Sequence, residues 1–158
     1  MLRSMKLAIA ALASVATFAL ASTETASAQN WNARPSYGTF RLNAGFLPDP
    51  QFLTGRAGGD RHSSAPGCPN GGWFANAPDF RIIYQAGGYP LTVYVRAPGD
   101  TMLLINDPAA NWYCNDDFDG LDPVIRFANP RSGQYDIWIG TYNRARVQNT
   151  RVYVTETR

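Results

Sequence analysis

The stretch Leu91–Arg96, LTVYVR, decides the fold class, because its leucine and two valines occupy every second position. In a β-strand, side chains at alternate positions lie on one face, so these three residues point toward a common core. The same alternation recurs in Tyr135–Ile139 and Val152–Val154, with polar residues in between. The pattern predicts strands that are each buried on one face.

Strand-length segments rich in branched or aromatic residues cover most of the chain after residue 37. They are Gly38–Leu42, Gln51–Thr54, Phe80–Gln85, Leu91–Arg96, Thr101–Asn106, Asn111–Cys114, Val124–Phe127, Gln134–Tyr142 and Thr150–Thr155. Glycine and proline mark the turns between them, at 87–88, 98–100, 107–108 and 130–133. We expect an all-β protein, an antiparallel β-sandwich of jelly-roll type.

Composition supports one turn-rich β domain. The 158 residues include 14 glycines and 11 prolines, and 13% are aromatic. We expect three parts, namely a leader over 1–28, an irregular segment over 29–79 whose short strands pack on the sandwich, and the sandwich itself over 80–158. The net charge is +2 and becomes +1 without the leader, which argues against a dedicated nucleic-acid binder.

The first 28 residues have the features of a secretory signal peptide. Arg3 and Lys6 precede an apolar run from Leu7 to Leu20, and Ala26–Ala28 forms a small-x-small cleavage site. We expect cleavage between Ala28 and Gln29 and a periplasmic or secreted protein; the alternative is an uncleaved anchor. No later segment is apolar for long enough to span a membrane.

If the protein is exported, its two cysteines, Cys68 and Cys114, are expected to form a disulfide, because an oxidising compartment favours their pairing. A zinc site would have only His62 beside the two thiols. A nucleophilic cysteine would lack a matched base. The sequence therefore favours a Cys68–Cys114 bridge.

A predicted hairpin gathers acidic residues. Strands 101–106 and 111–114 pair across the turn at 107–110, so the residues before the first strand and after the second lie at one end. The acidic residues brought to this end are Asp100, Asp116, Asp117 and Asp119. Carboxylates that crowd together repel one another unless a positive charge intervenes.

Calcium is the candidate cation. Asn115–Gly120 places oxygen-bearing side chains at alternate positions before a glycine, similar to the start of an EF-hand loop. The twelfth position is Arg126 instead of glutamate, so Asp100 would have to supply charge beside Asp116, Asp117 and Asp119. The alternatives are a solvated acidic loop that caps turns, or pairing of the cluster with Arg126 or another arginine.

Several aromatic residues could form a binding platform for sugar or peptide, although a β-sandwich core normally buries such side chains. The set comprises Trp73, Trp112, Tyr113, Trp138 and Tyr142. Trp138 lies on the opposite strand face from Ile137 and Ile139, so it is either exposed or covered by the N-terminal segment. Trp112 and Trp138 are the candidates for a binding surface.

Catalysis finds little support. His62 is the only histidine, and the adjacent Ser63 cannot easily align with it as a nucleophile. Asp116 and Asp117 could serve as paired carboxylates, but successive residues on a strand point to opposite faces. We expect a protein that is not an enzyme, with a hydrolase as the remote alternative.

Several blocks resemble the bacterial pre-peptidase C-terminal domain and its exported relatives. The matching blocks are Tyr84–Gly87, Asp100–Pro108, Asn111–Asp117 and Ser132–Tyr142. Arg41–Pro50 is similar to the N-terminal part of small stand-alone relatives in proteobacteria. The resemblance implies a small jelly-roll sandwich with a non-catalytic targeting or binding role, often beside secreted peptidases.

The sequence thus leads to a non-catalytic binding or accessory module, with calcium as a candidate stabilising ion, that recognises a protein or an envelope polymer. One alternative is a carbohydrate-binding module that uses exposed aromatic side chains. A second is a hydrolase or a peptidase-associated protein.

Overall fold

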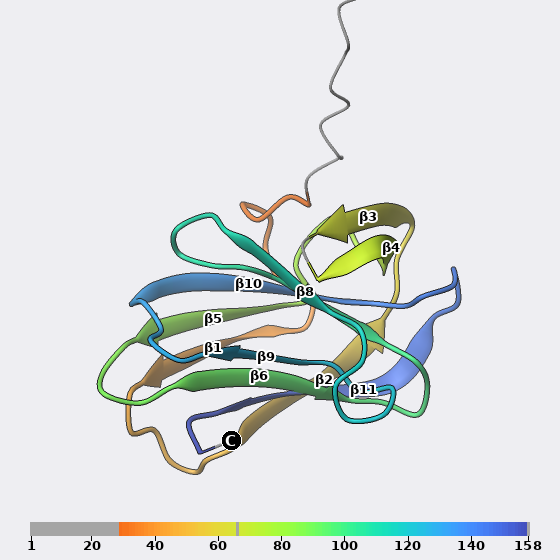
Figure 1. Ribbon diagram of the computed structural model, residues 1–158. Coiled ribbons are helices and arrows are strands. Elements are labelled where there is room, and N and C mark those ends of the chain that lie inside the picture. The colour runs from red at the N-terminus through yellow and green to blue at the C-terminus, as the bar shows by residue number, and fades with distance from the viewer. Residues whose placement is uncertain (1–28, 66, 158) are drawn as a thin grey trace, which may run out of the picture.

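The computed structural model describes residues 29–65 and 67–157. The predicted signal peptide and the Ala28 side of its cleavage site lie outside these residues. Two β-sheets pack face to face, and a separate hairpin lies over one end of the upper sheet in Figure 1. The predicted β-sandwich is confirmed.

The strands follow one another along the chain without an intervening helix in the described ranges. They are β1 (Gly38–Asn43), β2 (Gln51–Ala57), β3 (Arg61–Ala65), β4 (Cys68–Phe74), β5 (Phe80–Gln85), β6 (Leu91–Arg96), β7 (Met102–Asn106), β8 (Trp112–Asn115), β9 (Val124–Phe127), β10 (Gly133–Gly140) and β11 (Val147–Thr155). Within the same ranges, no helix has the length and apolar character needed to cross a membrane.

The five-stranded sheet has the order β1-β5-β10-β7-β8, and the four-stranded sheet has the order β2-β11-β6-β9. All pairs are antiparallel except β1 with β5, which is parallel. The five-stranded sheet is therefore mixed, where the sequence predicted antiparallel pairing throughout. The chain passes through β2 in the other sheet and through the β3–β4 hairpin before β5 returns beside β1, so the two strands run in the same direction.

Residues 38–57 belong to the sandwich itself. β1 pairs with β5 at an edge of one sheet, and β2 pairs with β11 at an edge of the other. The division expected at residue 79/80 therefore does not separate the sandwich from a segment packed on its outside. What lies outside is the β3–β4 hairpin, whose two strands are not among those expected from the sequence.

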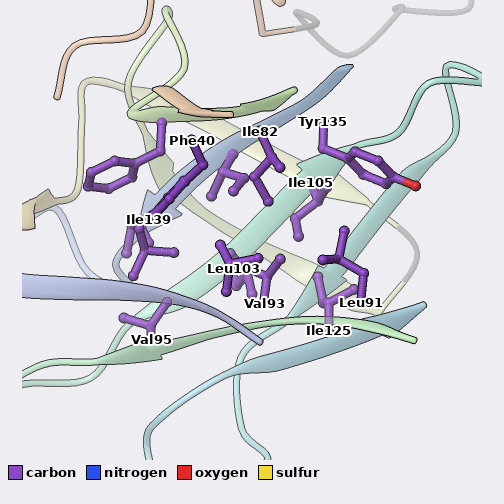
Figure 2. Close-up of a cluster of buried hydrophobic side chains, with 14 of the residues drawn as sticks. Phe40, Ile82, Leu91, Val93, Val95, Leu103, Ile105, Ile125, Tyr135 and Ile139 are labelled. Carbon is purple, nitrogen blue, oxygen red and sulfur yellow. The ribbon is translucent and has the colours of Figure 1, made fainter. Parts of the chain in front are cut away.

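The main core lies between the two sheets. Leu91, Val93 and Val95 from β6 are fully buried, and Ile137 and Ile139 from β10 face them from the other sheet. Figure 2 shows these two layers of side chains meeting, with Ile82 and Ile105 above Val93. The alternation in the sequence correctly predicted which residues build this core.

A smaller core lies on the outer side of the five-stranded sheet. Trp138 and Leu104 pack there against Phe74 of the hairpin. The hairpin can approach closely because β10 ends in Gly140, where a Cβ atom would lie 2.4 Å from the Phe74 ring. The predicted disulfide, Cys68–Cys114, joins β4 to β8 beside this cluster and is confirmed.

Candidate functional site

Three of the four predicted acidic residues gather at one end of the β7–β8 hairpin. β7 and β8 pair as predicted, with Leu103 opposite Asn115. Burial raises the pKa of Asp100, and the negative charges of Asp117 and Asp116 raise it further. The charges of Asp116 and Asp117 are therefore close enough to Asp100 to affect it, which agrees with the pairing of β7 with β8.

Asp119 is engaged elsewhere. Its Oδ2 accepts a hydrogen bond of 2.7 Å from Nη2 of Arg96, and Asp122 accepts one of 2.8 Å from Nη1 of the same guanidinium. Asn115 Oδ1 accepts from the backbone N–H of Val124 and so caps the loop. An arginine does pair with part of the acidic loop, as one alternative proposed, and it is Arg96 of β6.

Among residues 29–65 and 67–157, no group of three or more histidine, cysteine, aspartate or glutamate side chains is placed to hold a metal ion. The calcium site stays a prediction from the sequence.

Trp138, proposed as part of a binding surface, is not on the surface. Its exposed fraction is 0%, because the β3–β4 hairpin covers the outer face of β10 at this point. Trp112 is half-buried, and its ring lies 5.3 Å from Trp138 and 6.1 Å from Trp31. Of this chain of three indoles, Trp31 is the outermost, with 37% of its surface exposed.

The residues considered for catalysis, His62 and Ser63, both make structural contacts. The Ser63 hydroxyl is buried and donates a hydrogen bond of 2.8 Å to Gln29 Oε1. The His62 ring packs edge-on against Trp73, with centroids 5.3 Å apart. Within the described part of the chain, no hydrogen bond joins His62 to Ser63.

A row of three neighbouring aromatic rings lies on the outer face of the four-stranded sheet. Tyr153 of β11 lies directly between its cross-strand partners, Phe52 of β2 and Tyr94 of β6. The next row toward one end of the sheet holds Arg151, which is opposite Arg96. We call these five residues, Phe52, Tyr94, Tyr153, Arg96 and Arg151, the tyrosine–arginine face.

The rings of this face form a continuous stack. Tyr94 and Tyr153 are parallel within 4°, with centroids 4.8 Å apart, and Phe52 follows 5.5 Å from Tyr153. The guanidinium carbons of Arg96 and Arg151 lie 5.5 Å from the Tyr94 and Phe52 ring centroids, respectively. The planes of Tyr94 and Tyr153 face one another, whereas Phe52 is tilted by 36° relative to Tyr153, and a guanidinium group lies over the ring at each end of the row.

The charged side chains on the outer face of this sheet come from two sources, arginines of the strands and acidic residues of the β8–β9 loop. The outward positions of β2, β6, β9 and β11 carry four arginines and no acidic residue. These arginines are Arg56, Arg96, Arg126 and Arg151. Arg96 is held by Asp119 and Asp122 from the β8–β9 loop. Arg151 has no carboxylate within salt-bridge distance among the described residues.

The sequence did not lead us to predict this face, although the alternation indicates that its two tyrosines point outward. The alternation places Tyr94 and Tyr153 opposite the buried valines of their strands, so both are outward residues. Their stacking depends on β6 and β2 both pairing with β11 in a particular register. These strands are far apart in the sequence, so no local pattern specifies that register.

No protein-family model matches this chain, and no curated protein matches it. Its fold is similar to that of PliG from Aeromonas hydrophila, a periplasmic inhibitor of g-type lysozyme; the two are 14% identical, the TM-score is 0.42, and the match covers 75% of this chain and 96% of that one. It is also similar to the pre-peptidase C-terminal domain of a collagenase from Bacillus anthracis, at 13% identity and a TM-score of 0.45, over 78% and 100% of the two chains. Similarity at this level concerns the β fold and carries no argument about function.

Proposed function

We propose that this protein is an exported, non-catalytic binding module that recognises an acidic protein surface through the tyrosine–arginine face. The observation that carries the proposal is the stack of three rings across adjacent strands, with Phe52 52% exposed and arginines over both ends of the stack.

The composition of the face favours a protein partner. Tyrosine, other aromatic residues and arginine dominate the energetics of protein interfaces, because they bury a large area and lose little conformational freedom. Here Tyr153 is held between two rings, and Arg96 is held by two carboxylates. Side chains that are already ordered lose less entropy on binding.

The charge of the face favours an acidic partner. Arginine forms paired hydrogen bonds with carboxylates, and Arg151 has its guanidinium available for such a bond. The edges of aromatic rings carry partial positive charge, and Tyr94 and Tyr153 cover one another's ring planes. Both features attract carboxylate groups, whereas the covered ring planes give a sugar ring little to stack on.

Export is part of the proposal. The disulfide between Cys68 and Cys114 is typical of proteins that fold in an oxidising compartment, and the leader predicted from the sequence would deliver the chain there.

The test uses poly-L-glutamate as the acidic polypeptide, polygalacturonate as an acidic polysaccharide, and calorimetry to measure affinity. We expect saturable binding of poly-L-glutamate that weakens as salt is added. Tyr153→Ala removes the centre of the stack and is expected to weaken binding about tenfold. Arg151→Gln removes one exposed charge and is expected to weaken it about threefold.

The controls separate this face from general positive charge. Arg41→Gln removes an exposed arginine from β1 in the other sheet, and Tyr89→Ala removes an exposed tyrosine from the β5–β6 loop. Both are expected to bind poly-L-glutamate like the unmodified protein. Equal losses in Arg41→Gln and Arg151→Gln, or binding of polygalacturonate alone, would overturn the proposal.

A further inference from the structure

A concave site lies on the other sheet, where the N-terminal segment crosses the outer face of the five-stranded sheet. It is lined by Trp31, by Asn106 and Pro108 from the end of β7 and its turn, and by Gln134 and Asp136 of β10. Asn106 and Asp136 are direct cross-strand partners, so their side chains leave the same face of the sheet. We call this the Trp31 groove.

Arg81 fixes the position of Trp31. From β5, its Nη2 donates hydrogen bonds of 2.6 Å to the Trp31 carbonyl and 3.0 Å to the Ala33 carbonyl. Its Nε donates a 2.6 Å bond to Asp136 Oδ1. The Trp31 ring also rests edge-on against Trp112. The exposed indole is therefore held in place before any ligand arrives.

The carboxylates of the groove are already engaged. Asp136 accepts hydrogen bonds from Arg81 and from Gln134 Nε2, the latter at 2.7 Å. Asp107 Oδ1, at the turn after β7, accepts bonds of 2.8 Å from the backbone N–H groups of Ala109 and Asn111. Neither carboxylate depends on a bound cation for its partners.

The amide groups are only half used. Asn106 donates to the Asn111 carbonyl, and Gln134 donates to Asp136. Among the hydrogen bonds of the described residues, none is accepted by Asn106 Oδ1 or Gln134 Oε1. An amide that has spent its donor side offers its carbonyl oxygen to a ligand hydroxyl.

We propose that the Trp31 groove binds a neutral sugar. The apolar face of a sugar ring packs on the exposed indole, and its hydroxyls donate to the Asn106 and Gln134 carbonyl oxygens. The two carboxylates repel an acidic sugar, and their existing partners leave little for an ammonium ligand to neutralise. This site is independent of the tyrosine–arginine face, which lies on the other sheet.

The test is calorimetric titration with cellotetraose and with tri-N-acetylchitotriose, both neutral oligosaccharides of different chemistry. We expect at least one of them to bind saturably and Trp31→Ala to weaken that binding at least about tenfold. Gln134→Ala is expected to weaken it about threefold to tenfold, the effect of losing one hydrogen bond. Tyr153→Ala, on the far sheet, is expected to leave it unchanged.

Thermal melts of each variant check folding, and Trp31→Phe keeps an aromatic ring at the position if Trp31→Ala does not fold. Trp31→Phe is expected to retain most of the affinity. The proposal is overturned if neither oligosaccharide binds, if binding survives in Trp31→Ala, or if the groove instead takes trigalacturonate or choline. Because Tyr153→Ala affects only the other face, failure here leaves the proposed protein-binding function standing, and the reverse also holds.

Discussion

Trp138 lies on the outer face of the five-stranded sheet, and Tyr153 lies on the outer face of the four-stranded sheet. Both residues alternate with buried aliphatic residues of the main core, so their local sequences look alike. Trp138 is fully buried under the β3–β4 hairpin, whereas Tyr153 remains partly exposed within a stack of rings. An outward aromatic residue therefore becomes core or surface according to what the rest of the chain places over it.

Substitution of these two residues should show the contrast most strongly. Trp138→Ala empties the centre of the small core, and we expect it to lower the free energy of unfolding by about 3–5 kcal/mol. Tyr153→Ala should lower it by about 1 kcal/mol or less, because its neighbours are one cross-strand row. Urea denaturation measures both. Similar losses for the two variants would show that the outer faces are energetically equivalent after all.

The cover over Trp138 is also held by the disulfide. Replacing both Cys68 and Cys114 with alanine should reduce the free energy of unfolding by about 2–4 kcal/mol, since the bridge closes a loop of 46 residues in sequence separation. We expect the fluorescence of the folded variant to shift toward that of solvent-exposed tryptophan. An unchanged spectrum and unchanged stability would mean that hairpin packing alone covers Trp138.

A buried carboxyl makes the covered sheet sensitive to pH. Asp79 precedes β5, and its Oδ2 accepts a hydrogen bond of 2.8 Å from the backbone N–H of Ile139. Burial raises the pKa of Asp79 to about 8, opposed by that hydrogen bond and by the charges of Arg146 and Arg56. By contrast, Asp119 on the open side is exposed and paired with Arg96.

Stability should therefore fall as the pH rises through the window set by Asp79. Below about pH 4 the group is protonated in both states and contributes no difference. Between about pH 4 and pH 8 the unfolded state loses its proton while the folded state keeps it, which reduces stability by up to about 1.4 kcal/mol per pH unit. Above about pH 8 the effect is complete.

Asp79→Asn should flatten this dependence, because its amide oxygen can still accept from Ile139 and cannot ionise. Denaturation at a series of pH values compares the variant with Asp119→Asn, which should retain the slope. A slope that persists in Asp79→Asn would assign the pH dependence to another group.

The smallest expected effect concerns calcium at the end of the five-stranded sheet. If the ion binds the carboxylates of Asp100, Asp116 and Asp117, millimolar calcium should add about 1 kcal/mol to the free energy of unfolding relative to chelator. Asp117→Asn should abolish that gain, and Asp119→Asn should not, because Arg96 already holds Asp119. Melting curves that coincide with and without calcium would show that the protein has no stabilising calcium site.

Local pattern was enough to predict the strands of both sheets. β6 and β10 alternate with period two, and the turns beside them carry glycine or proline. The same pattern could not find β3 and β4, because HSS and PNGG are poor strand formers. These two strands pair because Phe74 packs on Trp138 and the disulfide fixes Cys68, both of which are long-range contacts.

The candidate site divides in the same way. The gathering of Asp100 with Asp116 and Asp117 followed from one hairpin, whose two strands are neighbours in sequence. The pairing of Asp119 with Arg96 joins a loop to a strand that precedes it by more than twenty residues. The near-neutral net charge also gave no sign that the outward strand positions of one sheet carry arginines and no acidic residue, because total charge contains no information about position.

The alternation of apolar and polar residues, by itself, determined that the chain forms a two-layered β-sandwich with a particular set of inward residues, since each strand reports its own two faces. Only the tertiary structure decided which outer face is covered and which rings stack, because both depend on strand register and on contacts between segments far apart in the chain. Local periodicity distinguishes the two sides of a strand, but it does not specify what lies against either side.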